Sequence, residues 1–290
     1  MIIVRLLGGI GNQMFQYAVG KQLAIINNCP LLLDSNYLKC QGDAEKNNFT
    51  NREFQLNQLN AQTVIAGNRE LKNVFSKSKY FRRFFGKEFQ IINEDPTQFI
   101  QSILSLRGNI YLNGYWQSEK YCSNIKSIIL NDFSVSSPLV GKNKILSEQI
   151  QNSQSISVHI RRGDYISNPL FADVIGTCKP EYYQQAISLF NSKLKKTVFY
   201  VFSDDIRWAK ENLKLSSKII YVDHNTESNC VEDLRLMSLC KHNIIANSSF
   251  SWWAAYLNRN PGKTVIAPQL WFKDSSLFNK DMIPDSWIRI

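Results

Sequence analysis

The sequence contains no run of about 18 apolar residues, so it offers no segment that would cross a membrane as a helix. Its six cysteines form no C-x-x-C pair and no regular spacing, which excludes the common zinc-ribbon and disulfide-framework patterns. In a chain of 290 residues this usage is typical of free thiols in a reducing compartment. The amino-terminal residues show no signal-peptide cleavage site. We therefore expect a cytoplasmic protein.

The sequence also lacks the motifs that hold the commonest cofactors. Its three histidines have no metal-ligand spacing, and no D-x-D pair is present for a divalent cation. The segment "GGIGNQM" is not a dinucleotide fingerprint, because Met14 stands where G-x-G-x-x-G requires its last glycine. No G-x-x-x-x-G-K-[ST] phosphate loop occurs. We expect neither a metal nor a bound cofactor.

The composition is basic. The chain has 34 Lys and Arg residues against 24 Asp and Glu, a formal net charge of +10. This charge favours an anionic partner: a nucleic acid, a phosphorylated small molecule or a membrane surface. No helix-turn-helix, RNA-recognition signature or basic stripe is present, so nucleic acid is the least favoured of the three.

Strand and helix patterns alternate along most of the chain. The first half begins as a β–α–β unit, with strands at 2–7 and 30–34. A helix is predicted at 96–106, and a polar stretch, 134–154, follows later. The alternation then restarts, with strands at 155–160, 197–203, 218–222, 243–247 and 263–268. The pattern predicts an α/β protein of two Rossmann-like domains, 1–150 and 151–290, with parallel sheets facing each other across a cleft.

Polar side chains collect where the strands of the second half end. Because the carboxyl ends of parallel strands share one edge of a sheet, these residues are expected to lie together. They are His159, Arg161, Arg162, Asp164, Ser203, Asp204, Asp205, Asn247, Ser248 and Ser249. Arginine offers a planar fork for phosphate oxygens, and the serines open a helix whose free N–H groups favour an anion. The pattern indicates a diphosphate site, and the alternative is a salt-bridge cluster beside an ordinary helix cap.

Of three further aromatic or basic stretches, two allow two interpretations. Tyr115 and Trp116 end a strand of the first half, where they form either a sugar-stacking platform or part of the core. Trp252 and Trp253 are favoured as core residues. Residues 69–87 combine seven basic residues with four phenylalanines. This stretch suits peripheral contact with an anionic membrane, or a solvated basic helix with its apolar face in the core.

Four motifs together resemble one enzyme family. They are "GGIGNQMFQYA", "HIRRGDY", "FSDD" and "NSSFSWWAAYL", in this order between residues 8 and 257. They look like the α-1,2-fucosyltransferases of glycosyltransferase family 11, and most of all like bacterial enzymes that modify O-antigen. The resemblance implies a GT-B-like fold, no metal, and GDP-β-L-fucose as donor. It also implies inverting transfer of fucose to O2 of a terminal galactose on a surface glycan.

The resemblance also assigns roles to individual residues. It implies that Arg161 holds the β-phosphate, that His159 and Asp233 contact guanine, and that Asn12 faces the fucose. The nucleotide site would further include Arg162, Asp204, Asp205, Asn247, Ser248 and Ser249. Asp164 is our candidate for the base that accepts the proton of the acceptor hydroxyl, and the alternative is that it holds the arginines in place. A glycosyltransferase that uses another nucleotide sugar remains the second hypothesis.

Overall fold

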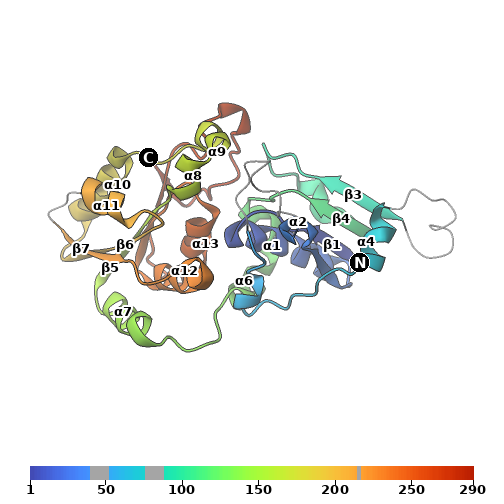
Figure 1. The fold of residues 1–290 in the computed structure, drawn as a ribbon, viewed down its shortest axis with the longest axis horizontal. Helices are drawn as coiled ribbons and strands as arrows, with labels where there is room; N and C mark the ends of the chain where they lie inside the picture. The colour runs from blue at the N-terminus through green and yellow to red at the C-terminus, as the bar shows by residue number, and fades with distance from the viewer. Residues whose placement is uncertain (40–51, 76–87, 214–216) are drawn as a thin grey trace. The chain divides into compact units, whose positions relative to one another are not determined.

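The computed structural model describes residues 1–39, 52–75, 88–213 and 217–290, which divide into two compact units (Figure 1). The first unit contains Met1–Ser134 with Asn279–Met282, and the second contains Val135–Phe278 with Ile283–Ile290. The sequence predicts a boundary after residue 150, whereas this division falls after residue 134. The roles predicted for the two domains stay predictions.

Four parallel strands form the sheet of the first unit, in the order β2-β1-β4-β3. The strands are β1 (Ile2–Arg5), β2 (Leu31–Asp34), β3 (Phe89–Asn93) and β4 (Asn109–Asn113). The helices are α1 (Ile10–Ile26), α2 (Asn36–Lys39), α4 (Asn68–Phe75) and α6 (Lys126–Asp132). A Cβ on Gly20 of α1 would lie 2.5 Å from Val4 of β1, so glycine permits the close packing of this helix on the sheet.

Six parallel strands form the sheet of the second unit, in the order β10-β9-β8-β5-β6-β7. The strands are β5 (Gln154–Ile160), β6 (Thr197–Ser203), β7 (Lys218–Val222), β8 (His242–Ile244), β9 (Val265–Ala267) and β10 (Ile288–Arg289). This is the doubly wound order, in which the chain builds outward from β5 in one direction and then returns to build in the other. The predicted Rossmann-like topology is confirmed for this unit.

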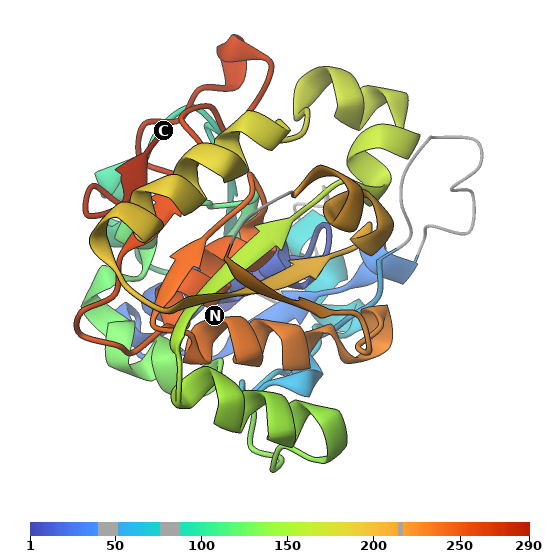
Figure 2. The same cartoon turned by 90° about the vertical axis from the view of Figure 1, so that its left-hand side faces the viewer.

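Helices cover both faces of the second sheet (Figure 2). They are α7 (Gly141–Gln151), α8 (Gly163–Ser167), α9 (Pro169–Val174), α10 (Pro180–Lys193), α11 (Ile206–Asn212), α12 (Cys230–Leu239) and α13 (Ser249–Leu257). Buried residues of α10 and α11 pack against β5 and β6, and α12 packs against α7 and α13. Trp252 and Trp253 of α13 are fully buried, so the predicted core role of these tryptophans is confirmed.

The polar stretch 134–154 contains the division between the units and the helix α7, anchored by buried Leu146 and Ile150. One sequence-based assignment was wrong. The helix predicted at 96–106 is only a 3₁₀ turn, Gln101–Ser105. The backbone of Ile100 is extended rather than helical. The N–H groups of Phe99 and Ile100 donate to the side chains of Asp281 and Tyr121, so contacts from outside the segment hold it in this conformation.

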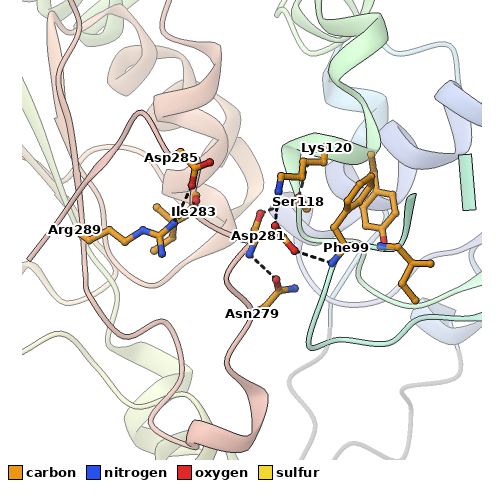
Figure 3. Close-up of polar contacts among 10 residues, drawn as sticks. Phe99, Ser118, Lys120, Asn279, Asp281, Ile283, Asp285 and Arg289 are labelled. Carbon is orange, nitrogen blue, oxygen red and sulfur yellow. Dashed lines mark hydrogen bonds and ion pairs between the residues drawn. The ribbon is translucent and has the colours of Figure 1, made fainter. Parts of the chain in front are cut away.

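A short carboxyl-terminal segment, Asn279–Met282, completes the first unit (Figure 3). Asp281 accepts hydrogen bonds from Phe99 N at 3.1 Å and Lys120 Nζ at 2.5 Å, and its carbonyl accepts from Ser118 Oγ at 2.8 Å. Asn279 Nδ2 donates to the carbonyl of Pro96 at 3.0 Å. The chain then re-enters the second unit, where Arg289 donates to the carbonyl of Ile283. We call Asn279–Met282 the return segment.

Candidate functional site

The strand order creates one favoured ligand position in the second unit. The chain reverses its direction of growth between β5 and β8, and ligands of doubly wound sheets bind outside the carboxyl ends of the strands at this switch point. Arg161 and Arg162 follow β5, while Ser248 and Ser249 follow β8. The residues after β6, the other neighbour of β5, are Asp204 and Asp205. The structure therefore places these predicted residues at one sheet edge.

Arg161 is held by two carboxylates. Its NH2 lies 2.6 Å from Asp164 Oδ1, and its NH1 lies 3.1 Å from Asp204 Oδ2, with 24% of the side chain exposed. Its guanidinium also lies 5.5 Å from the ring centre of Tyr165. These contacts fix the plane of the guanidinium and leave only part of its five N–H donors for a ligand. The ion pair favours the interpretation that Asp164 holds the arginine; its role as base stays a prediction.

Arg162 points to a different neighbour. Its Nε lies 3.2 Å from Asp205 Oδ2, and its guanidinium lies 4.0 Å from the ring centre of Trp208. Its backbone N–H donates to Asp204 Oδ1 at 2.9 Å. Asp205 in turn caps α11, because its Oδ1 accepts from Trp208 N. Two arginines therefore face three aspartates, so the cluster itself carries a formal charge of −1. Both arginines are thus already paired with carboxylates. The predicted diphosphate would have to bind the remaining guanidinium N–H groups and the α13 N-terminus.

His159 is buried beside this cluster. Burial, followed by the positive charge of Arg161, lowers the pKa of its imidazole to about 3, so the ring is neutral at physiological pH. Among the described residues, no group hydrogen-bonds to Nδ1, although that atom is buried. Buried polar atoms are nearly always paired in folded proteins, so this nitrogen is suited to a ligand.

The α13 N-terminus supplies the second half of the edge. Ser248 precedes the helix in an extended conformation, and its side chain makes no cap hydrogen bond. The first N–H groups of the helix are thus left for an anion. The Asn247 side chain is used differently: its Nδ2 donates to the carbonyls of Ile175, Gly176 and Trp271. Its predicted contact with the donor stays a prediction.

Asp233 lies in a separate polar network at the start of α12. Its Oδ1 accepts from Asn225 Nδ2 at 2.6 Å, and Asn225 is held in turn by Asn143 and Asn229. Burial raises the pKa of Asp233 to about 6, more than the bond from Asn225 lowers it. Within the described chain, no hydrogen bond or ion pair joins Asp233 to the Arg161 cluster. The carboxylate is held in place through Oδ1, and its predicted contact with guanine stays a prediction.

The first unit has its own switch point, between β1 and β4. Asn12, near the start of α1, accepts a hydrogen bond at Oδ1 from Gln117 Nε2 at 2.8 Å, just beyond β4. Tyr115 is 44% exposed, whereas Trp116 is 1% exposed and packs edge-on against Tyr121. Of the two aromatics predicted to receive the acceptor, only Tyr115 therefore presents its ring to solvent. Both acceptor roles, and that of Asn12, stay predictions.

Sequence reasoning missed Glu94, which follows β3. Its carboxylate accepts from the backbone N–H groups of Tyr115 at 2.5 Å and Trp116 at 2.7 Å. Burial raises the pKa of Glu94 to about 7 despite these bonds. Trp116 has φ +58°, a left-handed conformation that non-glycine residues rarely adopt. Glu94 therefore stabilises a strained loop, 114–117, that carries Tyr115 and the partner of Asn12. Only the non-local pairing of β3 with β4 reveals this role.

Other sequence features are only partly covered by the described residues. Residues 76–87 of the basic stretch lie outside them, and its beginning, α4, packs Leu71 and Val74 into the core. Contact of this stretch with a membrane stays a prediction. The described cysteines, Cys29, Cys122, Cys178, Cys230 and Cys240, are free thiols. No described helix has the length and apolar character needed to span a bilayer, and no group of three metal-ligating side chains occurs in the described ranges.

The whole chain, residues 1–290, matches the model of the family described as glycosyl transferase family 11. The chain belongs to glycosyltransferase family 11. It is 34% identical to an alpha-1,2-colitosyltransferase of Escherichia coli over 100% of this chain and 99% of that protein. It is 33% identical to the O-antigen biosynthesis glycosyltransferase WbnK of Escherichia coli, over 98% of each chain. A galactoside alpha-(1,2)-fucosyltransferase 2 of Hylobates lar is 23% identical over 95% of this chain and 74% of its own length.

The fold is similar to that of a solved structure. A mutant of Arabidopsis thaliana FUT1 in complex with GDP superposes with a TM-score of 0.50 and 12% identity, over 98% of this chain and 75% of that chain. At this identity the likeness concerns the fold alone. Together with the two parallel sheets, it confirms the predicted GT-B-like α/β fold. The family match likewise confirms that this chain is a glycosyltransferase.

Proposed function

We propose that this family 11 enzyme is a galactoside 2-α-L-fucosyltransferase. It transfers L-fucose from GDP-β-L-fucose to O2 of a terminal galactose on a surface glycan, with inversion at the anomeric carbon. The observation that carries the proposal is the edge at the β5/β8 switch point. There a doubly paired Arg161, a buried His159 with an unpartnered nitrogen, and the α13 N-terminus converge. Two of the relatives are named as α-1,2-specific transferases, which supports the linkage.

The chemistry follows from where charge develops. The bond between fucose C1 and the β-phosphate oxygen breaks, and its electron pair goes to GDP. The new bond forms between C1 and O2 of galactose on the opposite face, and the hydroxyl proton passes to a base. The remaining N–H groups of Arg161 and the α13 N-terminus donate to the phosphate oxygens as their negative charge grows. Because the carboxylates orient Arg161 beforehand, little reorganisation is needed in the transition state.

One experiment tests the reaction directly. The protein is incubated with GDP-β-L-fucose and a panel of β-galactosides, and the product linkage is assigned by NMR. An α-anomeric fucose attached at O2 of galactose is the expected result. Transfer with retained β configuration, attachment at another hydroxyl, or preference for UDP-sugars over GDP-fucose would contradict the proposal.

A second candidate donor deserves the same assay, because the full-length relative at 34% identity is named a colitosyltransferase. Colitose is fucose without the 3-hydroxyl group. A site built around a hydrogen bond to that hydroxyl rejects the deoxy sugar strongly, whereas an apolar site does not. The ratio of kcat/KM for GDP-fucose and GDP-colitose therefore decides which sugar this enzyme uses.

Metal removal is expected to leave activity unchanged. The proposed leaving-group contacts are guanidinium and backbone N–H groups, which supply the electrostatic stabilisation that a divalent cation gives in other transferases. The assay is repeated in EDTA and after addition of Mn²⁺ or Mg²⁺. A loss of most activity in EDTA that either cation restores would sink the metal-independent mechanism.

A further inference from the structure

A row of polar residues crosses the sheet of the first unit at the carboxyl ends of its strands. The strand register pairs Arg5 with Asp34 and Asn93 with Asn113. The pairing of β1 with β4, continued by one residue, places Arg5 beside Asn113. Side chains in register on parallel strands point to the same face of a sheet. We call Asp34, Arg5, Asn113 and Asn93 the polar row.

Hydrogen bonds join three members of the polar row in one direction. Arg5 NH1 donates to Asn113 Oδ1 at 3.2 Å, and Asn113 Nδ2 donates to Asn93 Oδ1 at 2.8 Å. The fourth member, Asp34, is buried and accepts from the hydroxyl of Tyr111 at 2.7 Å. The row is therefore preorganised, with each amide oriented by its neighbour.

Arg5 differs from Arg161 in that its donors are largely unused. It makes one hydrogen bond, and no described carboxylate forms an ion pair with it. Its guanidinium lies 4.8 Å from the ring centre of Tyr37, which holds the side chain in place. A guanidinium has about five N–H donors, so most of those on this half-buried arginine are left for oxygen atoms of a ligand.

A second aromatic side chain, the 44% exposed Tyr115, follows Asn113 of the polar row by two residues. Burial is the main cause of the raised pKa of Tyr115, and Tyr37, Glu94 and Arg5 all lie close enough to act on it too. Aromatic faces pack against the C–H faces of sugar rings, while planar polar groups bind pairs of sugar hydroxyls. A fixed arginine fork and amides beside two tyrosines thus fit a carbohydrate better than an apolar or purely anionic ligand.

We propose that the polar row, with Tyr37 and Tyr115, binds the second sugar of the glycan acceptor, the one that carries the terminal galactose. This inference rests on the proposed function. It adds the residues that would distinguish one galactoside acceptor from another. The loop 114–117 connects the two regions: it begins directly after Asn113 of the polar row, and its last residue, Gln117, contacts Asn12, the residue expected at the fucose. A glycan that runs along this loop would place its galactose at Asn12 and its second sugar on the polar row.

The test compares a monosaccharide acceptor with disaccharides. Arg5→Met keeps the apolar stem and removes the guanidinium. We expect the KM for the best of a panel of galactosyl disaccharides to rise about 10- to 100-fold, the size of one hydrogen bond to a charged group. The KM for methyl β-D-galactoside and the KM for GDP-fucose should change less than twofold or so. Arg107→Met is the matched control. Arg107 lies just before the amino-terminal end of β4, whereas the polar row lies at the carboxyl ends of the strands.

Two results would overturn the inference. One is an unchanged disaccharide KM in Arg5→Met. The other is an equal rise in the KM for methyl galactoside, which would show that Arg5 binds the galactose itself or only stabilises the fold. Saturation-transfer NMR of the same disaccharides with parent and variant reads binding without any transfer. If the parent binds them through Arg5 yet transfers no fucose, the acceptor site stands and the proposed donor reaction fails.

Discussion

The Arg161→Lys variant is expected to turn over about 10²–10³ times more slowly than the parent, while its affinity for GDP changes only a few-fold. Lysine keeps the positive charge but loses the planar fork, so it cannot face Asp164 and Asp204 together and still donate to the phosphates. The loss falls on turnover, because charge moves onto the β-phosphate only as the glycosidic bond breaks. Steady-state kinetics and calorimetric titration with GDP measure the two quantities.

Lysine is the informative substitution at this position. Arg161→Ala would leave two partly buried carboxylates without their cation, which destabilises the protein and confuses the kinetic result. The matched control is Arg207→Lys, in which the altered side chain is 91% exposed on α11 and, among the described residues, pairs with Glu211. Near-parental turnover in Arg161→Lys would show that the arginine serves the fold rather than the leaving group.

Asp233→Asn should raise the KM for GDP-fucose about 10- to 100-fold and weaken discrimination against ADP-fucose. A guanine offers two N–H donors to a carboxylate, and an amide replaces one acceptor by a donor. One charge-assisted hydrogen bond contributes about 1.5–3 kcal/mol, which sets the size of the effect. Asp223→Asn, at an exposed ion pair with Lys210 in the same unit, is the control.

The same residue gives the donor KM a pH dependence. Because the pKa of Asp233 is about 6, the KM for GDP-fucose should rise as pH falls through 6, and Asp233→Asn should show no such rise. GDP-fucose is a better probe than GDP, since it has no terminal phosphate that titrates in this range. The same raised pKa makes the folded protein less stable at higher pH, although the donor binds better there. The folded pKa lies above the ordinary value of 3.8, so the free energy of unfolding falls as pH rises from about 4 to 6. If the KM for GDP-fucose changes neither with pH nor in Asp233→Asn, the role of Asp233 is structural.

The edge after β5 was predictable because its signals are local. Each strand reads as a short apolar run, its polar residues follow directly, and parallel strands share an edge whatever their order. The ion pairs within that edge were not predictable. Asp164 is three residues from Arg161, but its competitor Asp204 comes from the next strand, and only the structure shows both on one guanidinium.

The first unit was less predictable, because its site depends on pairing between distant strands. Arg5, Asn113 and Asn93 form a row only through the order β2-β1-β4-β3. Trp116 and Tyr115 look alike in the sequence, yet the left-handed turn imposed at Trp116 buries one ring and exposes the other. Likewise, the segment 96–106 has a hydrogen bond from Phe99 N to Asp281, 182 residues away in the chain, which its own helical pattern could not reveal.

The return segment has a consequence for cutting and recombining this protein. A fragment that ends at Ser134 would lack Asp281, and Ser118, Lys120 and the N–H of Phe99 would lose a shared partner. A complete first unit therefore needs two pieces of chain, and the second unit is interrupted by one of them. Exchange of whole units between family members requires three junctions, after residues 134, 278 and 282. A single crossover would leave both units incomplete.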